Sequence, residues 1–340
     1  MRLALQNPIV RITLGLCVTG VFLWAVLKNV EFQRVIFVVA QVRWYVLPIS
    51  LVFLFADYAV RAARWWAMLH ACGMDVTFGA SARSLLISVS INNVAPLRVG
   101  DAVRIVSFPE RGQPMRVAGA LLLEKLLDTT VLFAFLLGGI AYLERIGSPL
   151  VPVGAVGVAG GLIFLAWAVA ILFADKVEYL VRRVCQHRSV ATRSSTEFVQ
   201  RHLSEFFSAL RIVRKSGLAL RLLLLSATAW LLEGAVFQTI AQGLDYQGHW
   251  YGPWFAFAAS TFATLIPSSP GYVGTFDFFA ISGLVAYGAS RTMAAALAFL
   301  VHAVLWLPLT IAGLACTLIS TSSVNRETIA AAFGRGRGNA

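Results

Sequence analysis

Long apolar runs separated by short polar stretches cover most of the chain. Residues 147–174 carry no charged side chain, residues 222–244 carry only Glu233, and residues 292–325 carry only His302 as an ionisable group. About 20 apolar residues suffice to cross the hydrocarbon core of a bilayer as a helix, so each run is long enough to span a membrane. The pattern therefore predicts an all-α polytopic membrane protein.

The apolar segments give a first map of the chain. About seven or eight transmembrane helices are expected among them, with one or two re-entrant broken helices in addition. The segments cover residues 9–27, 44–69, 80–97, 117–140, 149–174, 218–244, 251–267, 272–290 and 293–320.

The longest polar stretch, residues 175–217, is rich in arginine and divides the chain into halves 1–174 and 218–320. Basic loops remain on the cytoplasmic side, so this linker is expected inside the cell, with an amphipathic helix that carries a basic face. We expect a single transmembrane domain over residues 1–320 and a flexible basic tail at residues 321–340.

Proline and glycine interrupt one apolar segment in each half of the chain. Both interruptions contain the pattern Pro-x-x-Val-Gly followed by an acidic residue. A broken helix exposes backbone polar groups, so inside a bilayer it is tolerated only where it lines a cavity or is buried in protein. Two such breaks at corresponding positions indicate a transporter binding site near the membrane midplane. The breaking residues are Pro96, Gly100, Pro267, Pro270, Gly271 and Gly274.

The distribution of basic residues favours a re-entrant path for the first broken segment, 80–97. The loop that follows it, residues 98–116, carries four arginines and is expected on the cytoplasmic face. The second broken segment, 251–267, leaves two arrangements open. Either it re-enters from outside, which makes the halves inverted repeats with an external C-terminus, or it crosses, which leaves the C-terminus inside. For the site we favour the inverted repeat.

The two breaks bring different chemistry to the predicted cavity. The first brings guanidinium groups, which bind phosphate bidentately, and the second brings hydroxyl groups and the lone acid Asp277. The alternative is structural: loop-end arginines hold the cytoplasmic side, Arg61 pairs with Asp57 one turn earlier, and hydroxyls bond to broken backbone. The candidate headgroup-binding residues are Arg61, Arg64, Asn92, Asn93, Arg98, Arg104, Ser268, Ser269 and Tyr272.

Further charged side chains fall at membrane depth, where each costs a few kcal/mol and usually marks function. Glu124 and Asp128 lie one helical turn apart and face the same way, so either is a candidate carrier of a coupling proton. Alternatively, they pair across the bundle with Arg61, Arg98 or Arg104. The candidate proton carriers or ion-pair partners are Asp57, Asp101, Glu124, Lys125, Asp128, Glu233 and Asp277.

Composition agrees with a membrane protein and excludes several function classes. Hydrophobic residues make up 59% of the chain, more than a soluble domain can hide. The net charge of +12 fits basic loops against anionic headgroups, and no nucleic-acid-binding motif accompanies it. The four cysteines and five histidines show no disulfide or zinc spacing, so neither metal nor cofactor is expected. No P-loop motif is present, so ATP is not expected as the direct energy source.

Taken together, these motifs resemble the transmembrane region of the lysylphosphatidylglycerol synthase family, also called flippase-like proteins. The likeness covers roughly residues 10–320, and the family pattern has glutamate where Asp101 stands. The matching pieces are Arg61-x-x-Arg64-Trp65-Trp66, Asn93-x-x-Pro96-x-Arg98-x-Gly100-Asp101-x-x-Arg104, Glu124-Lys125-x-x-Asp128 and Pro270-Gly271-x-x-Gly274-Thr275-x-Asp277.

The resemblance implies movement of aminoacylated, isoprenoid-linked or glycosylated lipids between leaflets. No soluble aminoacyltransferase domain is seen up to Ala340, so we expect no synthesis of lysyl lipid. We expect a lipid flippase of the bacterial inner membrane, not an enzyme, that moves a phosphate-bearing or anionic lipid through a central polar cavity. Membrane lipids are the expected partners, and lipid-synthesis enzymes are further candidates. The alternatives are a membrane-embedded lipid-modifying transferase and an ion-coupled small-solute transporter.

Overall fold

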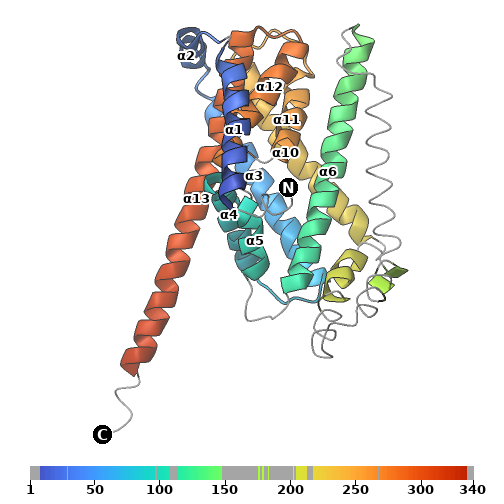
Figure 1. The fold of residues 1–340 in the computed structure, drawn as a ribbon, viewed down its shortest axis with the longest axis vertical. Coiled ribbons are helices and arrows are strands. Elements are labelled where there is room, and N and C mark those ends of the chain that lie inside the picture. The colour runs from blue at the N-terminus through green and yellow to red at the C-terminus, as the bar shows by residue number, and fades with distance from the viewer. Residues whose placement is uncertain are drawn as a thin grey trace.

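A computed structural model describes residues 8–28, 30–95, 98–107, 114–147, 217–266 and 268–334, with scattered positions between 175 and 212. Every regular element in these ranges is a helix, which confirms the predicted all-α class (Figure 1). Several sequence predictions lie outside the described residues: the breakers Pro96 and Pro267, the segment 149–174, most of the linker 175–217, and the end of the tail beyond Gly334.

Four of the described helices are long and apolar enough to cross a membrane. They are α3 (Val46–Ala71), α6 (Pro114–Arg145), α10 (Leu218–Gly243) and the part Arg291–Ile319 of α13 (Arg291–Gly334). Each covers one predicted apolar segment, and together they confirm an integral membrane protein. Two further helices, α1 (Pro8–Leu27) and α2 (Phe32–Ala40), precede them, and α2 lies between the predicted apolar segments 9–27 and 44–69.

The remaining helices form two broken pairs, each too short to span. In the first half, α4 (Phe78–Val94) is followed by α5 (Val99–Val106). In the second, α11 (Gly252–Ala263) is followed by the short 3₁₀ turn η5 (Pro270–Tyr272) and by α12 (Thr275–Ala286). At 1.5 Å per residue, a helix the length of α11 covers roughly 18 Å, well under the thickness of about 30 Å of a hydrocarbon core.

Figure 1 places the two broken pairs at opposite ends of the bundle. The pair α4–α5 lies in the lower part of the view and the pair α11–α12 in the upper part, so their breaks approach each other from opposite sides. The order of long helix, broken pair and long helix occurs twice, as α3, α4–α5, α6 and as α10, α11–α12, α13. An inverted repeat relating these halves stays a prediction.

The structure corrects the expected paths of both broken segments. Residues 99–106, expected in a loop, form the returning arm α5 of the first pair. In the second half the re-entrant unit is the whole stretch 252–286, not 251–267 alone. Helix α13 then runs from the upper to the lower end of the view, so the C-terminus lies at the lower end despite the re-entry (Figure 1).

Local sequence explains where the broken pairs turn. The backbone of Arg98 is left-handed, with φ 54°, and Gly271 and Gly274 have φ 69° and 85°, conformations that favour glycine. The close approach of α5 to α4 requires Gly100, because a Cβ atom there would lie 1.9 Å from the carbonyl oxygen of Ser88. At the second break, a side-chain oxygen of Asp277 accepts a hydrogen bond from the Gly274 amide at 2.9 Å and so starts α12.

Candidate functional site

A cavity of about 300 Å³ lies where α3, α6 and α10 meet the two breaks. The first broken pair contributes Asn92 and Arg98, and the second contributes Thr261, Thr264 and Leu265. The cavity therefore joins residues from both halves, as the two breaks predict. Its charged lining residues are Arg61, Arg98, Asp101, Arg104, Glu124, Lys125 and Asp128.

Arg104 forms one wall of the cavity with Glu124. From α5, its two terminal nitrogens donate to the two carboxylate oxygens of Glu124 on α6, at 3.0 and 2.8 Å. Its guanidinium lies over the ring of Trp65, 3.7 Å from the ring centre. Arg104 is only 1% exposed and Trp65 is fully buried. A buried guanidinium must be paired, so this contact holds α5 against α6 and α3.

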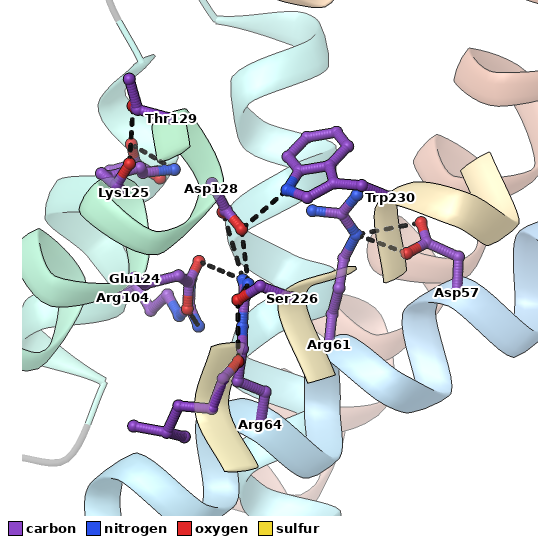
Figure 2. A network of polar contacts seen from close by, with 12 residues as sticks. Asp57, Arg61, Arg64, Arg104, Glu124, Lys125, Asp128, Thr129, Ser226 and Trp230 are labelled. Carbon is purple, nitrogen blue, oxygen red and sulfur yellow. Dashed lines mark hydrogen bonds and ion pairs between the residues drawn. The ribbon is translucent and has the colours of Figure 1, made fainter. Parts of the chain in front are cut away.

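Arg64 forms a second buried pair, with Asp128 (Figure 2). It also donates to the Ser226 hydroxyl at 2.6 Å, and the Glu124 carboxylate lies 3.8 Å away. The indole N–H of Trp230 donates to the same Asp128 at 2.9 Å. Asp128 on α6 is thus held by α3 and α10 together. The sequence predicted pairing for Asp128, but with other arginines.

Arg61 lies between two carboxylates, one on its own helix and one on α10. Its Nε donates to Asp57 at 2.7 and 2.9 Å, and one of its terminal nitrogens donates to Glu233 at 2.8 Å. The guanidinium also lies 4.0 Å from the ring centre of Trp230. The Asp57–Arg61 pair is the structural alternative stated from the helical spacing. Glu233 was predicted as a proton carrier or ion-pair partner, but the sequence did not specify Arg61 as its partner.

Lys125 and Asp101 form the most exposed ion pair of the cavity. Their charged atoms are 3.5 Å apart, and the two side chains are 39% and 20% exposed. Asn92 donates to the same Asp101 carboxylate at 3.1 Å, while its own buried carbonyl oxygen has no hydrogen-bond partner. This corner of the cavity is therefore more exposed than the two buried arginine pairs.

Arg98 stands apart from the other cavity cations. It donates to the Thr264 carbonyl oxygen at 3.1 Å and to the Thr264 hydroxyl at 2.8 Å, and it lies 5.7 Å from the ring centre of Tyr272. No carboxylate within the described ranges forms an ion pair with it, and its buried Nε has no hydrogen-bond partner. These contacts join the tip of the first broken pair to the second break.

The second break lines its own cavity of about 150 Å³, which includes Glu233, Gly271, Tyr272 and His302. His302 on α13 contacts the Asp277 carboxylate through Nδ1 and the Gly271 carbonyl oxygen through Nε2, both at 2.8 Å. The sequence identified Asp277 as a site residue but missed His302. Its signal was available, because His302 is the single ionisable residue of an otherwise uncharged apolar run.

The remaining predicted headgroup ligands bond to the protein itself. Ser268 accepts from the Thr275 hydroxyl at 3.0 Å, and the Ser269 hydroxyl donates to the Val273 carbonyl oxygen at 3.2 Å. Asn93 donates to the Thr310 hydroxyl at 2.9 Å. The contacts of Ser268 and Ser269 agree with the structural alternative, in which the hydroxyl groups form hydrogen bonds within the broken segment and do not bind a headgroup.

The cations of the cavity differ in whether a carboxylate already engages them. Within the described ranges, no group of three or more histidine, cysteine, aspartate and glutamate side chains is placed to hold a metal ion. Of the four arginines predicted as phosphate ligands, Arg61, Arg64 and Arg104 are occupied by carboxylates in this conformation, which leaves Arg98 as the available cation.

Comparison with known proteins gives one finding. The sequence model of a family described as the lysylphosphatidylglycerol synthase TM region matches residues 12–313, which is most of the chain. No match was found among curated proteins.

Proposed function

From the membership of this chain in the lysylphosphatidylglycerol synthase transmembrane-region family, a family of membrane proteins in lipid synthesis or translocation, we propose that it is a lipid translocase. The protein moves a lipid with a phosphate-bearing headgroup between leaflets. The headgroup passes through the central cavity while the acyl chains stay in the bilayer. The cell membrane of a bacterium is the proposed location.

The observation that carries this proposal is the state of Arg98. Arg98 lines the cavity without a carboxylate partner among the described residues, so its guanidinium is available to bind an anion. Guanidinium binds phosphate through parallel hydrogen bonds, so a phosphate oxygen can replace the Thr264 contacts. Lys125, weakly paired with Asp101, is the second cation within the same cavity.

The shape and lining of the cavity agree with an amphipathic substrate. Its volume of about 300 Å³ accommodates a headgroup and not a whole lipid. Leu265 lines the cavity and is 57% exposed, and the neighbouring Val94 and Val99 are 53% and 43% exposed. Exposed apolar side chains beside a polar cavity give the lipid chains a surface to follow.

The test uses the full chain reconstituted in liposomes. Fluorescent NBD-labelled phosphatidylglycerol is incorporated in both leaflets, and dithionite added outside reports the dye that reaches the outer leaflet. We expect wild type to move the labelled lipid, and Arg98→Ala to slow it at least tenfold because the phosphate loses its guanidinium ligand. Arg98→Lys should restore part of the rate, since charge remains without bidentate geometry.

Two controls make the result decisive. Arg34→Ala removes an arginine that is 72% exposed and paired only with Glu31 near the end of the bundle, so it should leave the rate unchanged. NBD-glucosylceramide, which has no phosphate, should move at least tenfold more slowly than the phosphatidylglycerol probe. Equal rates for both lipids, or a wild-type rate in Arg98→Ala, would contradict the proposal.

We further propose that the lipid crosses unchanged. The charged side chains of the cavity are mostly engaged with one another. Mass spectrometry of lipids recovered from the liposomes should therefore return only the masses supplied. A new lipid species would instead support the alternative of a membrane-embedded transferase.

A further inference from the structure

His302 lies between two hydrogen-bond acceptors, and this placement sets its protonation. One ring nitrogen faces the Asp277 carboxylate and the other faces the Gly271 carbonyl oxygen, each at 2.8 Å. Neither partner has a proton to give when the carboxylate is ionised. A neutral imidazole carries one N–H, so it can serve only one of these acceptors. Both contacts are hydrogen bonds only when the imidazole is doubly protonated, or when Asp277 holds the second proton.

The contacts of His302 and Asp277 connect a proton bound between them to the backbone of the second break. Gly271 has a left-handed backbone, with φ 69°, at the centre of η5. Its carbonyl oxygen contacts the Nε2 atom of His302. One carboxylate oxygen of Asp277 contacts Nδ1 of His302, and the other accepts a hydrogen bond from the Gly274 amide at the start of α12. Loss of the proton removes one of the two His302 contacts, which leaves either the turn or the start of α12 without its link to α13.

The surroundings of His302 contain few other titratable groups. The cavity of about 150 Å³ that it lines includes Glu233 of α10, Tyr58 of α3 and Tyr272 of η5, while α4 presents only the neutral Asn93. Glu233 is already bonded to Arg61 at 2.8 Å. His302 and Asp277 are therefore the titratable side chains that bond directly to the backbone of this break.

A short chain of contacts connects this proton to the headgroup site. Gly271 is followed by Tyr272, whose ring lies 5.7 Å from the Arg98 guanidinium. Thr264, which accepts both Arg98 hydrogen bonds, belongs to the same break and lines both cavities. Release of Gly271 therefore loosens the surface against which Arg98 is held.

We propose that His302 and Asp277 form a proton-binding site that closes the second break, and that binding and release of this proton couple lipid translocation to the proton gradient. The coupling rests on the proposed function, whereas the proton site and its effect on the break stand independently. Protons enter the site from one aqueous face and leave to the other as the break opens and closes.

The first measurement concerns the proton site and requires no transport. Full-length protein with ¹⁵N-labelled histidine is placed in nanodiscs, and the signal lost in His302→Gln identifies His302 among the five histidines. We expect two protonated ring nitrogens at pH 6 and one at pH 9. Asp277→Asn should weaken proton binding at least tenfold. Ring ¹⁵N signals of His302 that stay unchanged at every pH from 5 to 9 overturn the proton site, whichever of the two side chains holds the second proton.

The second measurement concerns the break itself. Amide hydrogen exchange of residues 268–278, corrected for the intrinsic pH dependence, should become at least tenfold faster between pH 6 and pH 9 in wild type. In His302→Gln it should be fast at both values. His249→Gln, at an exposed histidine near the upper end of the bundle, should behave as wild type. Equal protection at both pH values in wild type overturns the closing role.

The third measurement concerns coupling. In the liposome assay, a gradient of two pH units should change the rate of NBD-phosphatidylglycerol movement at least threefold, with opposite effects for the two gradient directions. His302→Gln should retain movement and lose the gradient effect. Wild-type rates that ignore the gradient overturn the coupling. Absence of any lipid movement overturns the coupling together with the proposed function, while the histidine titration still decides the proton site.

Discussion

At the scale of single residues, the cavity separates cations that build the structure from a cation that is free to bind. Arg64 and Arg104 are almost fully buried and each is bonded to a carboxylate of α6. Arg98 instead meets only neutral oxygens of Thr264 and the face of Tyr272. Because removal of one member of a buried pair leaves an unpaired charge, these two classes of arginine should respond differently to mutation.

Arg104→Ala should therefore destabilise the protein, whereas Arg98→Ala should not. The first change leaves the buried Glu124 without its bidentate partner, and removal of one partner from a buried pair costs about 3–5 kcal/mol. Thermal unfolding in detergent should show a clear loss of stability for Arg104→Ala and little change for Arg98→Ala. The double variant Arg104→Gln with Glu124→Gln should recover part of the loss. Equal melting temperatures for the two single variants would contradict the division.

At the scale of helices, the two broken pairs position the site. The turns within these pairs contain glycines at points of close backbone approach or positive φ. Gly100 lets α5 lie against α4, since a Cβ atom there would meet the backbone oxygen of Ser88. Arg98 sits two residues earlier, at the left-handed turn that joins the two helices. The position of the proposed phosphate ligand thus depends on the fit between α4 and α5.

Gly100→Ala should disturb this fit. The added Cβ would lie 1.9 Å from the Ser88 oxygen, so α5 must shift, at a cost of about 1–3 kcal/mol. We expect a lower melting temperature and a reduced translocation rate. Gly79→Ala is the matched control: it lies on α4 with nothing within 4 Å of the added atom, so it should be neutral or slightly stabilising. The prediction fails if both variants melt alike.

The sequence predicted which segments form the long helices, but it did not predict the direction in which the short helices run. Apolar runs identified all four long described helices, because span length is dictated by the bilayer. The return of the chain through α5 and α12 was not predicted, since both helices are short and the direction of a short helix depends on its packing. In the site, Arg61 and Asp57 follow from helical spacing, whereas Arg104 with Glu124 and Arg64 with Asp128 join distant segments. The pairing of Arg104 with Glu124 was one of the alternatives that the sequence left open, and the structure confirms it. The pairing of Arg64 with Asp128 was not predicted, because a single sequence does not identify which distant residues meet.

At the scale of the whole molecule, each connection between helices can be placed at one of the two ends of the bundle. The turn at residues 72–77 and the end of α13 lie at the lower end of Figure 1, whereas residues 244–251 lie at the upper end. The excess of basic residues predicts a cytoplasmic position for the linker 175–217, and α10, which follows that linker, begins at the lower end. We therefore predict that the lower end faces the cytoplasm.

Cysteine labelling tests this assignment. In a variant that lacks the four native cysteines, Asp75→Cys and Gly334→Cys should react with a membrane-impermeant maleimide only after the cytoplasmic face is opened. Gln247→Cys, in the loop between α10 and α11, should react in intact cells. Labelling of Gly334→Cys from outside would show that α13 does not return to the cytoplasmic face.

The balance of charge around the main cavity also determines how the protein responds to voltage. Five cations, Arg61, Arg64, Arg98, Arg104 and Lys125, are matched by five acids, Asp57, Asp101, Glu124, Asp128 and Glu233, so in their ordinary ionised forms these ten groups sum to zero. A conformational change of the empty site then moves little net charge through the membrane field. In the proposed translocation, the loaded site carries in addition the charge of its lipid. One elementary charge across 100 mV is worth about 2.3 kcal/mol, so an electrical potential acts on the loaded step and sets a preferred direction for an anionic lipid.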